Sequence, residues 1–195
     1  MRDWRTIAVI RTFFLVMLAM TFTHAWADGA FESDLAQCWS CHGQEGRSSD
    51  RTMPVIWGQS ADYIMKQLTD YREGGRENQI MSSMAESIPR AKLGEASKII
   101  SSKPWPASAA PAIKGALSDL AQACTACHGT DLTGAQTDAG PAPRLAGQNE
   151  LYLAEQMHAF ATGLRANHAT MTAIMRNLDG AQREDLARQI AHLAP

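Results

Sequence analysis

The sequence predicts an all-α protein made of two tandem domains, and three observations support this fold class. Apolar residues recur at helical spacing in both halves of the 195-residue chain, whereas strand patterns are scarce. A set of residues in the first half recurs at a fixed offset in the second half. Each half also contains one copy of a short Cys-His motif. The repeat therefore predicts two small helical domains rather than one large domain.

The motif, C-x-x-C-H, occurs at residues 38–42 and again at 124–128, and its two copies use all four cysteines of the chain. It is the attachment signature of a c-type haem. Because cysteines at i and i+3 lie on one face of a helical turn, both thiols can add to the vinyl groups of one porphyrin, and the histidine at i+4 then lies beneath the iron. The sequence predicts two covalently bound haem c groups. The predicted covalent ligands are Cys38, Cys41, Cys124 and Cys127, and the predicted axial histidines are His42 and His128.

Other uses of the four cysteines fit the spacing less well. Structural zinc favours two C-x₂-C pairs about 15–20 residues apart, but a whole domain separates Cys41 from Cys124. A thioredoxin-like pair needs a surrounding βαβ pattern, and the flanks are Ala-rich and helical. Two disulfides are compatible with an exported chain. They give no reason for a histidine after both pairs.

Residues 1–27 are typical of an export signal. Basic residues precede an apolar run at 12–23, and Ala25-Trp26-Ala27 matches an A-x-A cleavage site. The run is short for a membrane span, which needs about 20 residues, although an uncleaved anchor is the alternative. Because c-type haem is assembled outside the bacterial inner membrane, we expect a periplasmic protein cleaved after Ala27.

The two halves are copies of one domain. At an offset of 89 positions, the chain after the first motif matches the chain after the second. The matched pairs are Pro54 and Pro143, Gly58 and Gly147, Gln59 and Gln148, Tyr63 and Tyr152, Gln67 and Gln156, Gly74 and Gly163, Arg76 and Arg165, and Asn78 and Asn167.

These matches define the predicted domain boundaries. Residues 28–102 form the first domain and residues 114–195 form the second. Residues 103–113 contain three prolines among small residues, a composition typical of an extended linker. We expect Trp105, in this linker, to pack on one domain or in the interface.

Each domain is expected to contain three main helices. The first leads into the haem motif, through Phe31 and Leu35 in one half and through Leu117, Leu120 and Ala121 in the other. The second begins at Ser60 or Asn149 and ends at Gly74 or Gly163. Its expected apolar stripe is Tyr63, Ile64, Gln67, Leu68 and Tyr71, or Tyr152, Leu153, Gln156 and Phe160. The last helix follows Pro89 or begins at Asp179, where Gln182 completes a capping-box pattern. Its expected buried residues are Leu93, Ala96, Ile99 and Ile100, or Leu186, Ile190 and Leu193.

The second axial ligand decides whether a haem is reactive or suited to electron transfer. Methionine is the residue to look for, although most of the ten methionines must fill the core. At an offset of 90 positions Met81 coincides with Met171, each in an expected loop after a Gly-Arg-Asn segment. We therefore predict Met81 and Met171 as ligands, with Met84 and Met175 as alternatives.

Histidine is the other axial ligand to weigh. His158 and His192 have no counterpart in the first half, which favours surface or capping roles. His168, three residues before Met171, is the one rival. On the proximal side, an iron-ligating histidine usually donates its other ring N–H to a carbonyl. The carbonyls of the matched Pro54 and Pro143 are candidates to accept this hydrogen bond, although both prolines also suit ordinary loop turns.

At these residues the chain resembles the dihaem cytochrome c4 family over essentially its whole mature length. The resemblance rests on both C-x-x-C-H-G motifs, on Pro143-Arg144-Leu145-Ala146-Gly147-Gln148, and on residues 163–167 leading to Met171. It implies two class I cytochrome c domains related by a pseudo-twofold axis, with the haems close across the interface. The implied axial pairs are His42 with Met81 and His128 with Met171. The first half departs from the family at Trp57, within Pro54-Val55-Ile56-Trp57-Gly58-Gln59, and at the bulky Trp39.

The favoured function is electron transfer between respiratory donors and a terminal oxidase or reductase. The alternative is a dihaem cytochrome subunit of a dehydrogenase, such as flavocytochrome c sulfide dehydrogenase. An enzyme in its own right, such as a haem peroxidase or a thiosulfate-oxidising protein, needs a displaceable ligand at one iron, which paired methionines argue against. The expected partners are redox proteins, namely a membrane oxidase, a reductase or a dehydrogenase, and peripheral membrane association is compatible with this role. A formal net charge of −2 without a basic stripe gives no indication of nucleic-acid binding.

Overall fold

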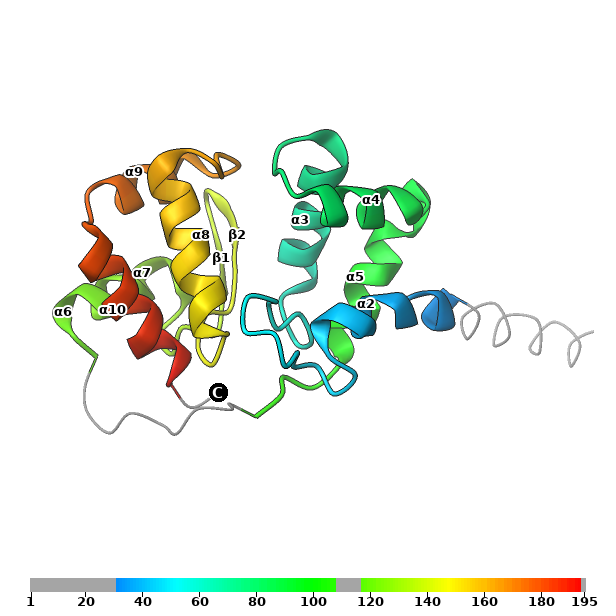
Figure 1. Cartoon of the computed structure of the whole chain (residues 1–195), viewed down its shortest axis with the longest axis horizontal. Helices are drawn as coiled ribbons and strands as arrows, with labels where there is room; N and C mark the ends of the chain where they lie inside the picture. Colours follow the sequence, from blue (N-terminus) through cyan, green and yellow to red (C-terminus); the bar gives the residue numbers. More distant parts are fainter. Residues whose placement is uncertain (1–30, 108–116, 194–195) are drawn as a thin grey trace, which may run out of the picture. The chain divides into compact units, whose positions relative to one another are not determined.

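The computed structural model describes residues 31–107 and 117–193. The predicted export signal, residues 1–27, lies outside the described residues, as does the predicted linker beyond residue 107. Residues 38–195 form one compact unit, so both haem-motif halves and the contacts between them belong to it. Within the described residues, the elements are mainly helices, as predicted (Figure 1).

In the first half, two long helices pack against each other. The helices of this half are α2 (Ala36–His42), α3 (Ala61–Glu73), α4 (Gln79–Ser87), a 3₁₀ turn at Arg90–Lys92, and α5 (Leu93–Ser102). The Ser60 hydroxyl accepts a hydrogen bond from the Tyr63 backbone N–H and so begins α3 at the predicted cap. Gly74, with φ of 78°, ends it in the left-handed conformation that glycine favours. α3 then packs on α4 and α5.

The second half repeats this plan. Its helices are α6 (Asp119–Ala123), α7 (Thr125–His128), α8 (Glu150–Thr162), α9 (Ala169–Arg176) and α10 (Gly180–Ala191). The predicted capping box is present, since Asp179 and Gln182 exchange side-chain to backbone hydrogen bonds at the start of α10. α8 packs on α9 and α10 around a core that includes Leu153, Phe160 and Leu186.

Two features of the fold differ from the sequence prediction. The segments expected to be loops around Met81 and Met171 are the helices α4 and α9, because Asn78 and His168 cap their first turns. The second half also contains a short antiparallel hairpin of β1 (Ala135–Thr137) and β2 (Gly140–Ala142).

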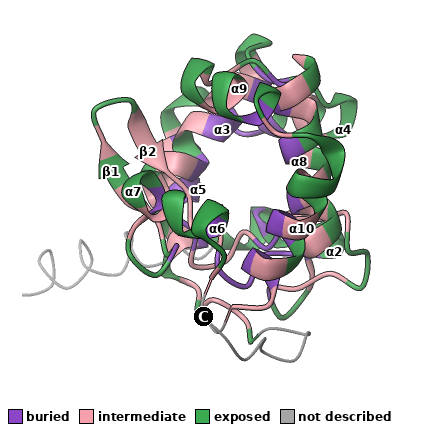
Figure 2. Cartoon of the chain, turned by 90° about the vertical axis from the view of Figure 1, so that its left-hand side faces the viewer, coloured by how far each residue is buried: buried purple, intermediate pink, exposed green. Residues whose placement is uncertain are grey.

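The burial pattern corrects several expected core positions. Buried and exposed faces alternate around the helices, as amphipathic packing requires (Figure 2). Leu120 is exposed, while Ile99 and Leu193 are only half-buried. On α5 the buried position next to Ala96 is Ser97, whose hydroxyl donates to the Leu93 carbonyl. None of the helices in the described part of the chain combines the length and apolar character that a membrane crossing requires.

Candidate functional site

The first haem motif presents two thiols and one buried imidazole from a single helical segment. Cys38 and Cys41 are one turn apart on α2 and neither forms a disulfide. His42 ends this helix and is buried. Its Nδ1 lies 2.9 Å from the carbonyl oxygen of Pro54. A carbonyl only accepts, so Nδ1 must donate, and Nε2 then keeps the lone pair that a metal ligand needs.

The second motif has the same arrangement. Cys124 and Cys127 are likewise free thiols, and His128 is buried at the end of α7. Its Nδ1 lies 2.9 Å from the carbonyl oxygen of Pro143. Both halves therefore fix the same histidine tautomer in the same way.

The electrostatics keep these donors in the forms that haem attachment uses. Burial lowers the pKa of His42 and of His128, more than the hydrogen bond to the proline carbonyl raises it. Both imidazoles are therefore neutral at pH 7. Burial also raises the pKa of the Cys38 and Cys124 thiols.

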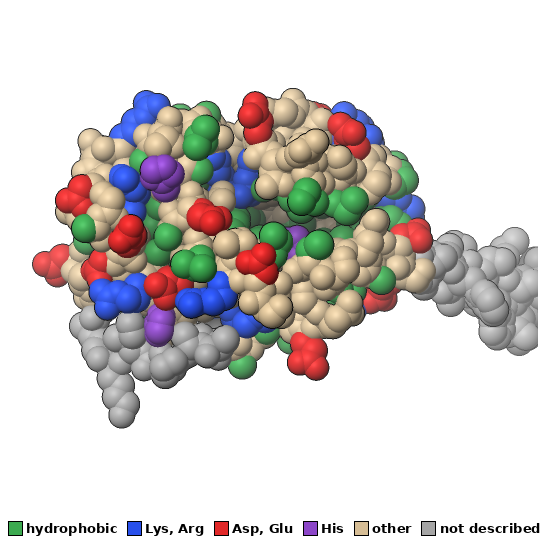
Figure 3. Space-filling model, in the orientation of Figure 1, with side chains coloured by type: hydrophobic (Ala, Val, Ile, Leu, Met, Phe, Trp, Pro, Cys, Tyr) green, Lys and Arg blue, Asp and Glu red, His purple; other side chains and the backbone are tan. Residues whose placement is uncertain are grey.

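The residues present fit haem c better than they fit a metal ion alone. Each motif offers one neutral imidazole beside two thiols, a donor set that suits a porphyrin with vinyl groups. Among the described residues, no group of three or more histidine, cysteine or acidic side chains is arranged to hold a metal. The space-filling view shows a hollow in the first half, rimmed by hydrophobic side chains and containing a histidine (Figure 3).

Met81 and Met171 occupy equivalent places in the two halves. Each is the third residue of its helix, α4 or α9, and each is half-buried. The Asn78 side chain accepts a hydrogen bond from the Met81 backbone N–H at 2.9 Å, and the His168 ring accepts one from the Met171 N–H at 3.3 Å. The capping hydrogen bonds hold both methionine backbones in the same helical position.

The rival axial ligands have other roles in the structure. Met175 is 3% exposed and belongs to the core of the second half, where it matches the fully buried Ala85. The His168 ring caps α9, as Asn78 caps α4. Met84 is half-buried on α4.

The matched glutamines of the repeat join the two halves. Gln59 accepts a hydrogen bond from the Arg144 backbone N–H at 2.8 Å and donates to the Arg144 carbonyl at 2.9 Å. Gln148 does the same with Val55, at 2.7 and 2.8 Å. Each glutamine thus satisfies the backbone of the opposite half, and the two pairs are related by the 89-residue offset.

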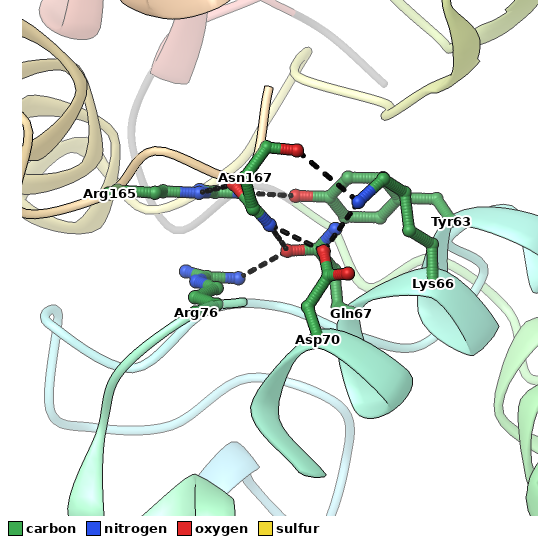
Figure 4. Close-up of polar contacts among 7 residues, drawn as sticks. All are labelled: Tyr63, Lys66, Gln67, Asp70, Arg76, Arg165 and Asn167. Carbon is green, nitrogen blue, oxygen red and sulfur yellow. Dashed lines mark hydrogen bonds and ion pairs between the residues drawn. The ribbon is translucent and has the colours of Figure 1, made fainter. Parts of the chain in front are cut away.

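A second set of matched residues forms a buried polar network between α3 and α8. Arg76 donates to Gln67 at 2.8 Å in its own half and to Gln156 at 2.6 Å across the interface. Arg165 donates to Gln156 at 2.9 Å in its own half and to Gln67 at 2.9 Å across the interface. Part of this network is drawn in Figure 4.

Tyrosines and an asparagine extend the network. Arg76 also donates to the Tyr152 hydroxyl at 3.1 Å, and Arg165 to the Tyr63 hydroxyl at 3.0 Å. The Asn167 side chain donates a hydrogen bond to the Asp70 carboxylate at 2.6 Å. Figure 4 shows this pair beside Lys66. Arg76 and Arg165 are only 7% and 6% exposed. The side-chain partners of both guanidinium groups in the described part of the chain are neutral, so two buried cations lie together with no carboxylate bonded to either of them.

The described part of the linker packs between the halves, as expected for Trp105. The Arg144 guanidinium lies 4.5 Å above the Trp105 ring in a cation–π contact. Arg47 donates to the Ala107 carbonyl and, at 2.9 Å, to the Gly147 carbonyl of the second half. Linker and interface are therefore one packed region.

Sequence reasoning missed the purpose of several residues that it had identified. Gln67 and Gln156 were expected in an apolar stripe, but they are acceptors in the polar network. The sequence contained a signal for this role, namely that the two glutamines match across the repeat. A polar residue that recurs at the same place in both halves can bond to the opposite half as well as lie in the core of its own half.

This fold and site define a class of protein, the dihaem c-type cytochromes, in which each of two small helical domains holds one covalently bound haem. The cytochrome c family model matches residues 114–194. Cytochrome c4 of Azotobacter vinelandii is 31% identical over 84% of this chain and 87% of its own length. The solved structure of Acidithiobacillus ferrooxidans cytochrome c4 covers 81% of this chain and 99% of its own, with 28% identity and a TM-score of 0.68.

The chain belongs to the cytochrome c4 family. It carries two covalently bound haem c groups and is an electron-transfer protein rather than an enzyme. A thiosulfate dehydrogenase electron acceptor of Stutzerimonas stutzeri is also similar, at 31% identity over 67% of this chain and 65% of its own length. The partners are therefore redox proteins, and the family relationship indicates that the chain is exported.

Proposed function

We propose that this chain is a periplasmic electron carrier in which His42 and Met81 hold the iron of one haem and His128 and Met171 hold the other. Cys38 and Cys41 attach the first haem, and Cys124 and Cys127 attach the second. The observation that supports this best is the repeated histidine geometry, with Nδ1 of each ring 2.9 Å from a matched proline carbonyl. It orients one neutral imidazole in each half with Nε2 free for iron.

Haem c, when attached, supplies reversible one-electron chemistry. The residues of this chain orient the haem ligands and set the reduction potential and the access of water. Pro54 and Pro143 orient the proximal histidines, and methionine ligation raises the reduction potential relative to two histidines. Burial around each histidine limits access of water, which also favours the reduced form.

The interface has a separate role in this proposal. Gln59 and Gln148 each form hydrogen bonds to the backbone of the opposite half. These bonds keep the two domains, 28–102 and 114–195, in a fixed relative position. A fixed relative position of the domains keeps the distance between the two haem sites constant. An electron can then enter at one half and leave from the other.

The cellular location follows from the export signal in residues 1–27, with cleavage after Ala27, and from the compartment in which haem c is attached. Residues 103–113 are the linker between the domains. The proposed donors and acceptors are respiratory proteins, with a membrane oxidase or a reductase downstream.

A second candidate partner is a thiosulfate-oxidising dehydrogenase, because one relative is named as the electron acceptor of such an enzyme. A permanent dehydrogenase subunit, as in flavocytochrome c sulfide dehydrogenase, is the weaker alternative. Stoichiometric co-purification with a flavoprotein would favour the subunit role, whereas isolation as a free dihaem protein favours the shuttle.

Spectroelectrochemical titration of the purified holoprotein tests the proposal. We expect two low-spin haems that reduce in two one-electron steps at positive potential. Pyridine haemochrome analysis should give two haem c groups per chain. A high-spin haem in the resting oxidised protein would contradict methionine ligation in that half.

A further inference from the structure

Two buried tryptophan N–H groups have no acceptor among the residues that the structure describes. The indole Nε1 atoms of Trp57 and Trp105 are the buried side-chain polar atoms that lack a hydrogen-bond partner among the described residues. A buried indole N–H ordinarily finds an acceptor, because the interior offers no water to replace a missing hydrogen bond. The two donors therefore point to an acceptor other than the described residues of the chain.

Trp57 lies beside the first haem motif. It follows Pro54 by three residues, and the Pro54 carbonyl accepts the His42 Nδ1–H hydrogen bond. Its ring packs edge-to-face on Trp39, with 5.5 Å between ring centroids and 89° between planes. Trp39 stands between the two haem cysteines, so the Trp57 indole is in contact with the attachment helix.

The loop after the motif is shaped to admit this ring. A Cβ atom on Gly46 would lie 2.7 Å from carbons of the Trp57 ring, which is too close for any side chain. Gly46 also has φ of +83°, a conformation that glycine adopts at little cost. The Trp57 ring therefore has one defined place.

Trp105 is held against the residue next to Trp57. A Cβ atom on Gly58 would lie 2.9 Å from the Trp105 backbone nitrogen, so the linker passes directly over this glycine. On the other side, the Arg144 guanidinium covers the Trp105 ring at 4.5 Å. The two indoles thus belong to one packed region, which is made of the first half, the linker and Arg144 of the second half.

The second half has no tryptophan in the corresponding positions. The residue that matches Trp57 at the 89-residue offset is Ala146, which is fully buried, and no tryptophan follows Trp105 in the sequence. The indole donors of Trp57 and Trp105 therefore have no counterpart in the sequence of the second half.

We propose that the indole N–H groups of Trp57 and Trp105 donate hydrogen bonds to the propionate carboxylates of the haem attached at Cys38 and Cys41. This inference rests on the proposed haem attachment in the first half. Haem c brings two carboxylates, which are acceptors that need donors when they are buried. The indoles supply neutral donors at one haem only, and Trp105 in this way fastens the linker to the first haem.

The consequence is a difference between the two sites. A hydrogen bond to a propionate draws off part of its negative charge, and negative charge near the iron stabilises the oxidised state. The two indoles therefore raise the potential of the first haem, while the second haem is unaffected by them.

The variants Trp57→Phe and Trp105→Phe test the assignment in the holoprotein, because they keep an aromatic ring and remove the N–H donor. We expect each variant to retain two haems and to move one of the two reduction steps to lower potential, with the other step unchanged. Trp39→Phe is the matched control, since its indole nitrogen is not among the unpartnered buried atoms. The Trp39→Phe variant should leave both reduction steps at the potentials of the unmodified protein.

A measurement on the unmodified protein does not depend on the folding of a variant. In the reduced, diamagnetic holoprotein, each indole proton should show a nuclear Overhauser contact to propionate methylene protons of one haem. Absence of both contacts, or reduction steps that stay in place in both Phe variants, would overturn the assignment. A purified chain without two haems would instead refute the proposed function, so the two failures are distinguishable.

Discussion

Arg76 and Arg165 share both of their glutamine acceptors: each guanidinium donates to Gln67 and to Gln156, at distances between 2.6 and 2.9 Å. Each ring-stacking contact is also repeated, with Arg76 4.7 Å from the Tyr71 ring centroid and Arg165 4.4 Å from that of Phe160. Two like charges lie close together because neutral oxygens lie between them. The duplicated sequence thus builds a symmetric polar core between the halves.

Gln67→Leu and Gln156→Leu should destabilise the holoprotein to a similar extent. Each change removes an oxygen that accepts from two buried cations, and hydrogen bonds to charged groups contribute about 1.5–3 kcal/mol. The double variant should cost less than twice the single ones, because both residues serve the same pair of arginines. Urea unfolding of the four proteins measures these values.

Gln136→Leu is the matched control. Its side chain also reaches the other half, donating to Asp62 at 2.6 Å, but it is exposed. Its cost should stay within about 0.5 kcal/mol. Equal losses for Gln136 and Gln67 would argue against a special role for the buried network.

Met81→Ala and Met171→Ala should each remove the methionine–iron absorption band at the red end of the oxidised spectrum from one haem. Loss of the thioether ligand should also lower the potential of that haem. The two changes should act on different reduction steps, because each methionine belongs to a different half. Absorption spectra and redox titrations of the two variants record both effects.

Met84→Leu and Met175→Leu control for the loss of a methionine in the same helices. Met84 is half-buried and Met175 is a core residue, and leucine conserves the volume of each. Both variants should retain two methionine–iron bands. Loss of a band in the Met84 variant would mean that Met84, and not Met81, binds the iron of the first half. Loss of a band in the Met175 variant would mean the same for Met175 and Met171 in the second half.

The sequence predicted the main helices correctly because their boundaries are local. Ser60, Gly74 and the Asp179–Gln182 capping box act within one turn, and each begins or ends its helix as expected. α4 and α9 were wrongly expected as loops. Their caps are Asn78 and His168, and only the first of these is a strong capping residue by type.

The interface was harder to predict because its interactions are not local. Gln59 forms a hydrogen bond to Arg144, which lies 85 positions away in the sequence. From its residue type alone, a glutamine can lie on the surface or be buried. The helical stripe of α3 contains Gln67, which periodicity alone assigns to an apolar core. Matching residues across the repeat identified the important positions, but only the packed structure reveals that they face the other half.

Stability should fall at alkaline pH because of Tyr71. Burial raises the pKa of its phenol, although the nearby Arg76 guanidinium acts in the opposite direction. The folded protein therefore keeps this proton when the unfolded chain, with a tyrosine pKa of about 10, releases it. Above that pH the unfolded state binds fewer protons, and the free energy of unfolding falls by about 1.4 kcal/mol per pH unit for this group.

Tyr71→Phe isolates this contribution. The second half already has Phe160 at the matched position beneath Arg165, so the ring should pack without strain. Urea unfolding between pH 9 and 11 should show a shallower decline for the variant. An identical decline in both proteins would mean that Tyr71 ionises equally in the folded and unfolded states.

Haem attachment should be needed for the fold of each half. Domains this small bury only about 60% of the surface of their unfolded chains, so the haem must complete the core. In Cys38→Ala/Cys41→Ala, which cannot attach the first haem, we expect the far-UV circular dichroism of the first half to be lost while the second haem remains low-spin. Cys124→Ala/Cys127→Ala is the mirror experiment. Native helix content in either variant would show that the polypeptide core is sufficient without its haem.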